Sequence, residues 1–208
     1  MQYLYHHTGQ IWQLSAAHLA LVSTALAIAF VVALPLALLV ASKPAAAGPI
    51  LGVLGAVYTI PSLALFALLI PVLGLGFWTA VIALAAYAQM ILVRNFAAAI
   101  NGVDRATVEA ARGMGMQPWQ IFWLVERPLA MPVALAGIRL ATVSLIGIAT
   151  IAAWINAGGL GTLVLDGIQH DYPQKAVAGA VAAVALALAA DFGLRRIEAT
   201  YSIRLERG

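Results

Sequence analysis

The sequence predicts an all-α membrane protein with about five transmembrane helices, and three observations support this prediction. Hydrophobic residues make up 63% of the chain and charged residues only 9%, with a mean hydropathy of +0.97. Soluble domains carry roughly 25% charged residues, so water is not the main solvent of this chain. The apolar residues gather in long runs, and one polar, charged stretch, residues 98–130, interrupts them.

Each apolar run is close to the roughly 20 residues that a helix needs to cross a bilayer core of about 30 Å. The predicted spans are residues 16–41, 49–73, 77–97, 131–155 and 175–194. The first run is not expected to be a cleavable signal, because no Lys or Arg precedes it and it is longer than the apolar part of a signal peptide. We therefore interpret residues 1–208 as a single membrane domain.

The basic residues predict the orientation of the chain. If the N-terminus lies outside and the C-terminus lies in the cytoplasm, Lys175 is the one basic residue outside. Basic residues are enriched on the cytoplasmic side of membrane proteins, which favours this orientation over its inverse. The predicted cytoplasmic set contains Lys43, Arg94, Arg105, Arg112, Arg127, Arg139, Arg195, Arg196, Arg204 and Arg207.

Polar residues inside the spans are expected to find partners or to reach water. Arg139 falls about two turns into the fourth span, and its long side chain is expected to extend towards the cytoplasmic interface. Direct contact of Arg139 with a transported solute is the alternative. Gln89 and Asn95 in the third span are expected to form hydrogen bonds between helices.

Two groups of residues are candidates for a route through the membrane. Pro61, with Thr59 and Ser62, predicts a kink in the second span, because a proline frees a backbone carbonyl that a neighbour or cavity water must satisfy. A packing kink is the alternative. Gly158, Gly159 and Gly161 lie in the predicted external stretch 156–174 and allow helices to approach closely, so they are candidates for an outer gate.

The polar stretch between the third and fourth spans predicts a helix–turn–helix. Asp104 is expected to cap the first helix, which continues to Arg112. Gly113 and Gly115 are expected to allow a sharp turn with positive φ, and Pro118 suits the first turn of a second helix. This second helix has an apolar face formed by Ile121, Phe122, Leu124 and Val125. The motif is either an amphipathic connector at the interface or a docking surface for a soluble partner.

Several classes of function are excluded or disfavoured. The chain has no Cys, so it cannot hold a disulfide or a thiolate metal site. It lacks the glycine-rich phosphate loop that would bind ATP and any set of nucleophile, base and orienting group, so we expect no enzymatic activity. We predict no metal site at His6, His7, His18 or His170, no other cofactor and no nucleic-acid partner.

The polar stretch resembles the EAA loop of ABC-importer permeases, the segment that docks on the ATPase subunit. Glu109, Ala110 and Ala111 match the first three positions of that pattern, Gly115 follows after three residues, and Pro128 falls at its final proline. Val125 replaces an isoleucine conservatively. Arg127 replaces a leucine, which is a departure that affects how the end of the loop packs.

Four ordered blocks extend the resemblance to nearly the whole chain. They are TIPSLALFALLIPVLGLG at 59–76, GVDRATVEAARGMGM at 102–116, RPLAMPVALAGIR at 127–139 and AGGLGTLVLDGI at 157–168. These blocks are similar to the permeases of glycine betaine, carnitine and choline importers. Trp154-Ile155-Asn156 departs from that subfamily just before the external glycines.

The resemblance implies a type I, MetI-like permease fold whose cytoplasmic coupling loop contains Glu109, Ala110, Ala111, Gly113, Gly115 and Pro128. It also implies an ATPase subunit that binds ATP and Mg²⁺, a second permease that is identical or paralogous, and a periplasmic or lipid-anchored binding protein. The expected solute is a small quaternary-amine osmolyte, and another small polar solute such as an amino acid is the alternative. Two different classes, a secondary transporter and a membrane scaffold, are the remaining alternatives.

Overall fold

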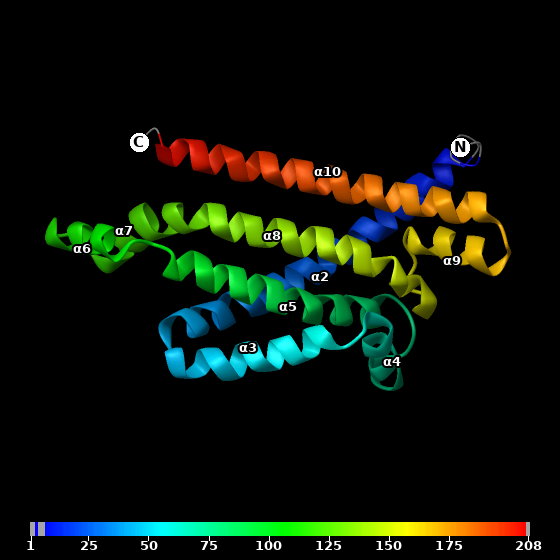
Figure 1. Ribbon diagram of the computed structural model, residues 1–208, viewed down its shortest axis with the longest axis horizontal. Helices are drawn as coiled ribbons and strands as arrows, with labels where there is room; N and C mark the ends of the chain where they lie inside the picture. The colour runs from blue at the N-terminus through cyan, green and yellow to red at the C-terminus, as the bar shows by residue number, and fades with distance from the viewer. Residues whose placement is uncertain (1–2, 4–6, 207–208) are drawn as a thin grey trace.

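The computed structural model describes Tyr3 and residues 7–206, with side chains at Tyr3 and from 7 to 201, and the regular structure of these residues is helical (Figure 1). His6, Arg207 and the side chain of Arg204 lie outside this described part. The helices are α2 (Thr8–Ser42), α3 (Pro44–Thr59), α4 (Ser62–Leu73), α5 (Phe77–Asn101), α6 (Arg105–Gly113), α7 (Pro118–Ile121), a π-helical segment (Phe122–Glu126), α8 (Arg127–Ala149), a 3₁₀ segment (Ile151–Ile155), α9 (Gly161–Gln169) and α10 (Pro173–Glu206).

Four helical stretches among the described residues are long and apolar enough to cross a membrane, and α3 with α4 makes a fifth span if this bent pair is counted as one. The two helices of the pair meet at 97°, so the second apolar run is not one straight helix. Ile60, between them, has φ −65° and ψ 128°. This extended conformation is the one that a residue preceding proline prefers, and Pro61 therefore explains the bend.

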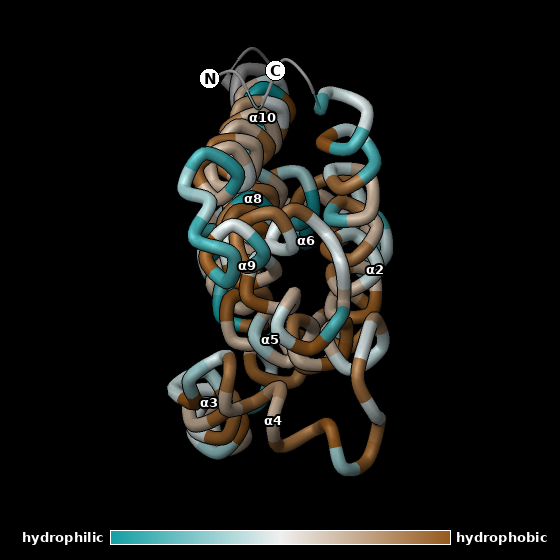
Figure 2. The backbone as a smooth tube through the Cα atoms, turned by 90° about the vertical axis from the view of Figure 1, so that its right-hand side faces the viewer, coloured by the Kyte–Doolittle hydropathy of each residue, from teal (hydrophilic) through white to brown (hydrophobic). Residues whose placement is uncertain are grey.

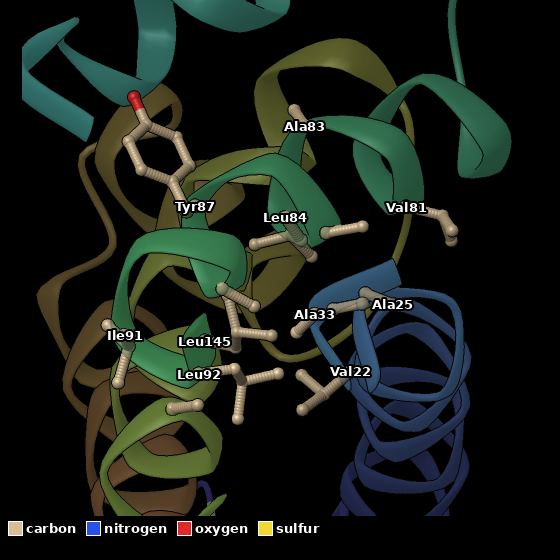
Figure 3. Close-up of a cluster of buried hydrophobic side chains, with 14 of the residues drawn as sticks. Val22, Ala25, Ala33, Val81, Ala83, Leu84, Tyr87, Ile91, Leu92 and Leu145 are labelled. Atoms are coloured by element: carbon tan, nitrogen blue, oxygen red, sulfur yellow. The ribbon is translucent and has the colours of Figure 1, made fainter. Parts of the chain in front are cut away.

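Helices α2 and α5 form the centre of the bundle. The buried face of α2 repeats small residues every four positions, at Ala25, Ala29, Ala33 and Ala37, and each of these is fully buried. Small side chains at this spacing let two helix backbones approach closely in a membrane. Figure 3 shows how Ala25 and Ala33 face larger side chains of α5, with Leu145 of α8 closing the cluster.

The opposite faces of these helices expose large apolar side chains. On α2 the exposed residues include Phe30, Val31 and Leu38. Hydrophobic residues also cover most of α4, of whose side chains Leu65 and Phe66 are buried within the chain (Figure 2). A surface of this kind suits lipid or a second membrane subunit rather than water.

The bundle has two distinct ends (Figure 1). Helices α6 and α7 lie at one end with the C-terminal part of α10, which we call the α6 end. Helix α9 lies at the other end with the start of α2, which we call the α9 end. Helix α9 packs tightly on α10 there, because a Cβ on Gly167 would sit 2.3 Å from the backbone N of Ala176 and one on Gly179 would sit 2.7 Å from Cβ of Leu163.

Candidate functional site

The α6 end carries the helix–turn–helix that the sequence predicts. Asp104 caps α6: its carboxylate accepts hydrogen bonds from the backbone N–H of Ala106 at 3.2 Å and of Thr107 at 3.3 Å, and from the Thr107 hydroxyl at 3.1 Å. The bond from the Ala106 N–H is the main reason that the pKa of Asp104 is lowered from its ordinary value. Because the cap satisfies donors that the first helical turn leaves unpaired, it fixes where α6 begins.

The turn after α6 depends on Gly115. Its φ is +82°, in the left-handed region that side chains with a Cβ rarely adopt. The sequence predicted a turn with positive φ at both Gly113 and Gly115. This prediction was wrong for Gly113, which is the last residue of α6 and has helical geometry. The turn falls two residues later than Gly113 because Met114 still donates its N–H to the carbonyl of Ala110, as a helical residue does.

The second helix of the motif runs directly into the fourth span. Gln117 and Gln120 form a reciprocal capping box at its start, and Pro118 occupies the first turn as expected. A π-helical segment then joins α7 to α8, so residues 118–149 form one stretch of 32 residues, with Pro128 at the start of α8. Of the predicted apolar face, Ile121 is buried and Phe122 and Leu124 are exposed.

A cavity of about 560 Å³ lies beside α6. The cavity is lined by one face of α6, whose residues follow helical spacing. The turn between α2 and α3, the end of α5 and Glu126 complete its wall. The side chain of Glu109 lines this cavity and makes no hydrogen bond or ion pair with any described residue. Ala110 is exposed and Ala111 is buried. The side chains that line the cavity from α6 are Arg105, Val108, Glu109 and Arg112.

The bend between α3 and α4 contains Thr59, Pro61 and Ser62, the candidate residues for the wall of a route through the membrane. The Tyr87 hydroxyl of α5 donates a hydrogen bond to the carbonyl of Ile60, which the bend leaves without a helical partner. Thr59 donates within its own helix to the carbonyl of Ala56 at 2.8 Å. Pro61 is exposed and Ser62 is half-buried. Because free backbone is not tolerated against lipid, this bend suits a protein-lined or water-lined surface.

The glycines at the α9 end differ from one another. Gly158 and Gly159 have φ of +83° and +80°, and a Cβ on Gly159 would sit 2.8 Å from Nδ1 of His18. Gly161 begins α9, and a Cβ there would sit 1.9 Å from the carbonyl oxygen of Thr150. Gly159 and Gly161 are therefore required by close packing, whereas Gly158 is required by its backbone conformation alone.

Polar side chains within the bundle find partners that the sequence did not reveal. Arg139 of α8 donates from Nη1 to Asp191 at 2.9 Å and from Nε to Glu198 at 3.0 Å. Both acids lie in the C-terminal half of α10, and the sequence analysis did not name them as its partners. Gln89 donates to the carbonyl of Ala29 on α2 at 3.1 Å, as predicted for a bond between helices. Asn95 instead donates within α5, to Ile91 at 2.8 Å.

His18 is a further residue whose role the sequence did not reveal. It is fully buried on α2 and contacts both the end of α8 and the start of α9. Its single position in the sequence carries no signal of these contacts, because its partners lie more than a hundred residues away. Among the described residues, no three His, Asp or Glu side chains come together in a group that could hold a metal ion.

The family model of the binding-protein-dependent transport system inner membrane component matches residues 33–202. The chain is 39% identical to the carnitine transport permease protein OpuCB of Listeria monocytogenes, over 91% of this chain and 85% of the relative. It is 38% identical to the osmoprotectant import permease protein OsmW of Salmonella typhimurium, over 95% of this chain and 94% of the relative.

A solved structure shows the same fold. The inward-facing MetNI methionine ABC transporter in its native crystal form matches with a TM-score of 0.78 and 23% identity, over 97% of this chain and 98% of the solved chain. The type I, MetI-like arrangement of helices is thus shared. With the family match over most of the sequence, these similarities establish that the chain belongs to the inner membrane components of binding-protein-dependent transport systems.

Proposed function

We propose that this chain forms one wall of the translocation pathway of an ATP-driven importer for a small quaternary-amine osmolyte such as glycine betaine, choline or carnitine. The names of the two relatives, a carnitine permease and an osmoprotectant import permease, support this class of solute. Family membership removes the two other classes that the sequence left open, a secondary transporter and a membrane scaffold.

The proposed partners follow from how such a subunit works. ATP with Mg²⁺ is bound and hydrolysed by a separate ATPase subunit, a second permease supplies the opposite wall of the pathway, and a binding protein delivers the solute from outside. The N-terminus lies outside and the C-terminus in the cytoplasm, so the α6 end is cytoplasmic. The excess of Lys and Arg on this side supports the orientation.

The cavity beside α6 is the observation that carries the proposed coupling. The cavity is lined by two carboxylates, Glu109 and Glu126, and by two guanidinium groups, Arg105 and Arg112. Such a lining suits a segment of the ATPase that carries charges of both signs, in which a basic residue forms a charge-assisted hydrogen bond with Glu109. Movement of the ATPase then moves α6, and α8 follows through α7. The residues proposed for this coupling are Glu109, Ala110, Ala111, Gly113, Gly115 and Pro128.

The proposed pathway uses the bend and the external glycines. Thr59, Pro61 and Ser62 form part of the pathway wall, and Gly158, Gly159 and Gly161 form part of the outer gate. The interruption of the helix at the bend supports this placement, because backbone that leaves a helix needs partners other than lipid, as the Tyr87 hydroxyl provides for the carbonyl of Ile60. The spans carry few polar groups, so we assign most of the choice of solute to the binding protein.

Reconstitution of the complete transporter tests the proposed function. Proteoliposomes that contain this subunit, its second permease, its ATPase and its binding protein should accumulate radiolabelled glycine betaine, choline or carnitine only when ATP is supplied. Uptake of methionine and histidine is measured in parallel. Uptake of these amino acids without uptake of any of the three osmolytes would overturn the proposed solute class.

Two substitutions of Glu109 test the proposed coupling. Glu109→Gln keeps the size of the side chain and removes its charge, whereas Glu109→Asp keeps the charge. We expect the Gln variant to weaken co-purification of the ATPase and to lower uptake about tenfold, since hydrogen bonds to charged groups contribute about 1.5–3 kcal/mol. The Asp variant should retain most of both. Equal behaviour of the two variants would show that the charge of Glu109 does not bind the ATPase.

A further inference from the structure

His18 joins three parts of the chain that are far apart in sequence. It lies on α2 near the α9 end and has no exposed surface. Its Nε2 lies 3.0 Å from the carbonyl oxygen of Ile146 on α8, and its Nδ1 lies 3.2 Å from the backbone N of Leu160, next to α9. These distances are those of hydrogen bonds.

The two bonds require one form of the imidazole ring. The backbone N–H of Leu160 can only donate, so Nδ1 of His18 must accept and carries no proton. Nε2 then carries the proton and donates it to the carbonyl of Ile146. The neutral ring in this tautomer therefore makes both bonds at once.

Both partners of His18 are backbone groups that a helix end leaves unpaired. Ile146 lies in the last turn of α8, where Thr150 donates its N–H to Gly147. Leu160 directly precedes the first residue of α9, where backbone N–H groups have no partner within the helix. His18 satisfies one group at the end of α8 and one at the start of α9, so it bridges the connection between them.

The connection itself lies against His18. We call residues 157–161 the glycine segment. A Cβ on Gly159 would lie 2.8 Å from Nδ1 of His18 and 3.3 Å from its Cβ, so only glycine fits while the ring holds this position. The side chain of the next residue, Leu160, is fully buried and packs with Leu163 and Ala178. The segment is therefore held on one side by the ring and on the other by this small core.

We infer that His18 is a positioning residue for transport, which holds the glycine segment against α2 and α8 until the bond to Leu160 is released. The consequence for transport rests on the proposed function. In the importer, a glycine segment held in this way keeps the outer gate closed when no binding protein is docked. Release of the hydrogen bond to Leu160 frees the glycine segment. The hydrogen bond to Ile146 satisfies a carbonyl at the end of α8 and does not hold the segment.

Two substitutions separate the two bonds. In His18→Asn, the amide oxygen Oδ1 takes the place of Nδ1 and can accept from Leu160, but nothing reaches Ile146. In His18→Gln, the amide nitrogen takes the place of Nε2 and can donate to Ile146, but the acceptor for Leu160 is lost. Gln89→Met is the matched control, because it removes another buried bond from a side chain to the backbone of α2, at Ala29, away from the glycine segment.

The measurement is the labelling of a cysteine by a membrane-impermeant maleimide. The chain contains no Cys, so Ala157→Cys introduces the single reactive thiol of the chain, at a half-buried position within the glycine segment. We expect the thiol of Ala157→Cys to be labelled about ten times faster when His18→Gln is added than when His18 is retained. With His18→Asn or Gln89→Met added, it should be labelled at the same rate as with His18 retained. The magnitude follows from the loss of one hydrogen bond.

A second measurement shows whether the segment acts as a gate. In the complete transporter, ATP hydrolysis without binding protein should rise several-fold in His18→Gln and stay unchanged in His18→Asn. A cysteine at His170, whose side chain is 71% exposed, reports the general access of the reagent and should label equally in all variants.

Three results would overturn the inference. Equal labelling of Ala157→Cys in both His18 variants would show that the Leu160 bond does not hold the segment. Faster labelling in His18→Asn than in His18→Gln would assign the role to Ile146. Failure of both variants to reach the membrane would make His18 a requirement of folding. None of these depends on the solute, so a transporter that fails to import osmolytes would contradict the proposed function alone.

Discussion

Arg139 of α8 and Asp191 of α10 form a partly exposed ion pair between the two helices, with 2.9 Å between Nη1 and Oδ1. Asp191 also accepts from Arg195 at 2.7 Å, and Arg139 also donates to Glu198. The four charges balance, and they join two helices that are adjacent in space but separated in sequence. Because charges within a membrane are costly unless paired, this network explains how α8 tolerates an arginine.

We predict that Arg139 and Asp191 stabilise the protein jointly. Arg139→Gln and Asp191→Asn should each destabilise it, and the double variant should lose less than the sum of the two, with a coupling energy of about 0.5–3 kcal/mol. Unfolding of the detergent-solubilised subunit measures this. Arg94→Gln, on the exposed side of α5, serves as the control and should leave stability unchanged. Additive losses would show that the ion pair contributes nothing.

Gly115 and Gly113 should respond in opposite ways to substitution. Neither has an atom within 4 Å of an added Cβ, so the difference comes from the backbone alone. Gly115→Val forces a β-branched residue into positive φ, which costs about 1–2 kcal/mol or more, and should stop uptake while membrane insertion persists. Gly113→Ala keeps the helical backbone of Gly113 and should stabilise α6 by at most about 1 kcal/mol, so uptake should fall far less than in Gly115→Val. Normal uptake by Gly115→Val would remove the turn from the coupling mechanism.

Protection of the α6 amides should depend on pH through Asp104. Folding lowers the pKa of this carboxyl group, so its stabilising effect is complete above the unfolded value of about 3.9. It is lost as the pH falls through the lowered pKa of the folded state. Hydrogen-exchange protection factors of α6 should therefore be constant from about pH 5 to 8 and fall below about pH 4. Asp104→Asn should keep the cap without this dependence on pH, and protection that changes between pH 5 and 8 would point to another group.

Bulky residues in the glycine segment should lower transport without changing the choice of solute. Gly159→Leu collides with His18, so uptake of two competing osmolytes should fall by a similar factor. Gly161→Ala should impair uptake more than Gly158→Ala, because a Cβ meets the Thr150 backbone at Gly161 and nothing within 4 Å at Gly158. A large change in the ratio of the two osmolytes, with total uptake preserved, would place a selectivity site in this subunit.

Reporter tags test the orientation. A tag before Met1 should be accessible from outside the cell, and a tag after Gly208 should be accessible only after the membrane is permeabilised. The number of spans is tested by the same measurement, because an odd number places the termini on opposite sides. Both tags on one side would mean that the bent pair of α3 and α4 enters and leaves the membrane on the same side.

The features that the sequence predicted are those set by local chemistry. The long apolar runs, the Asp104 cap, the positive φ of Gly115 and the helix start at Pro118 each depend on a few neighbouring residues. Gly113 was assigned wrongly because a glycine can also end a helix with ordinary geometry. The position of the turn depends on which carbonyl accepts from the N–H of the residue after the glycine, here Met114. The composition of the segment does not determine this.

The features that the sequence did not predict depend on helix packing. Arg139 and Asp191 are on different helices, and so are His18 and its partners, so no spacing pattern connects them. The 97° angle between α3 and α4 had a visible cause in Pro61, but a proline predicts only that a helix is disturbed. Its direction follows from Tyr87 and the neighbouring helices, which are placed by the rest of the fold.

The unbroken stretch from α7 through α8 has a mechanical consequence. Its 32 residues make a rod about 48 Å long at 1.5 Å per residue. Gly137 lies against Asn95 of α5, where a Cβ would sit 2.4 Å from Asn95 Cβ, and a stiff rod that pivots at this close approach would act as a lever. Gly137 lies about 28 Å from Pro118 and about 18 Å from Ala149. A push at α7 would therefore reappear beside His18 reversed in direction and reduced by about one-third, as in a lever with unequal arms.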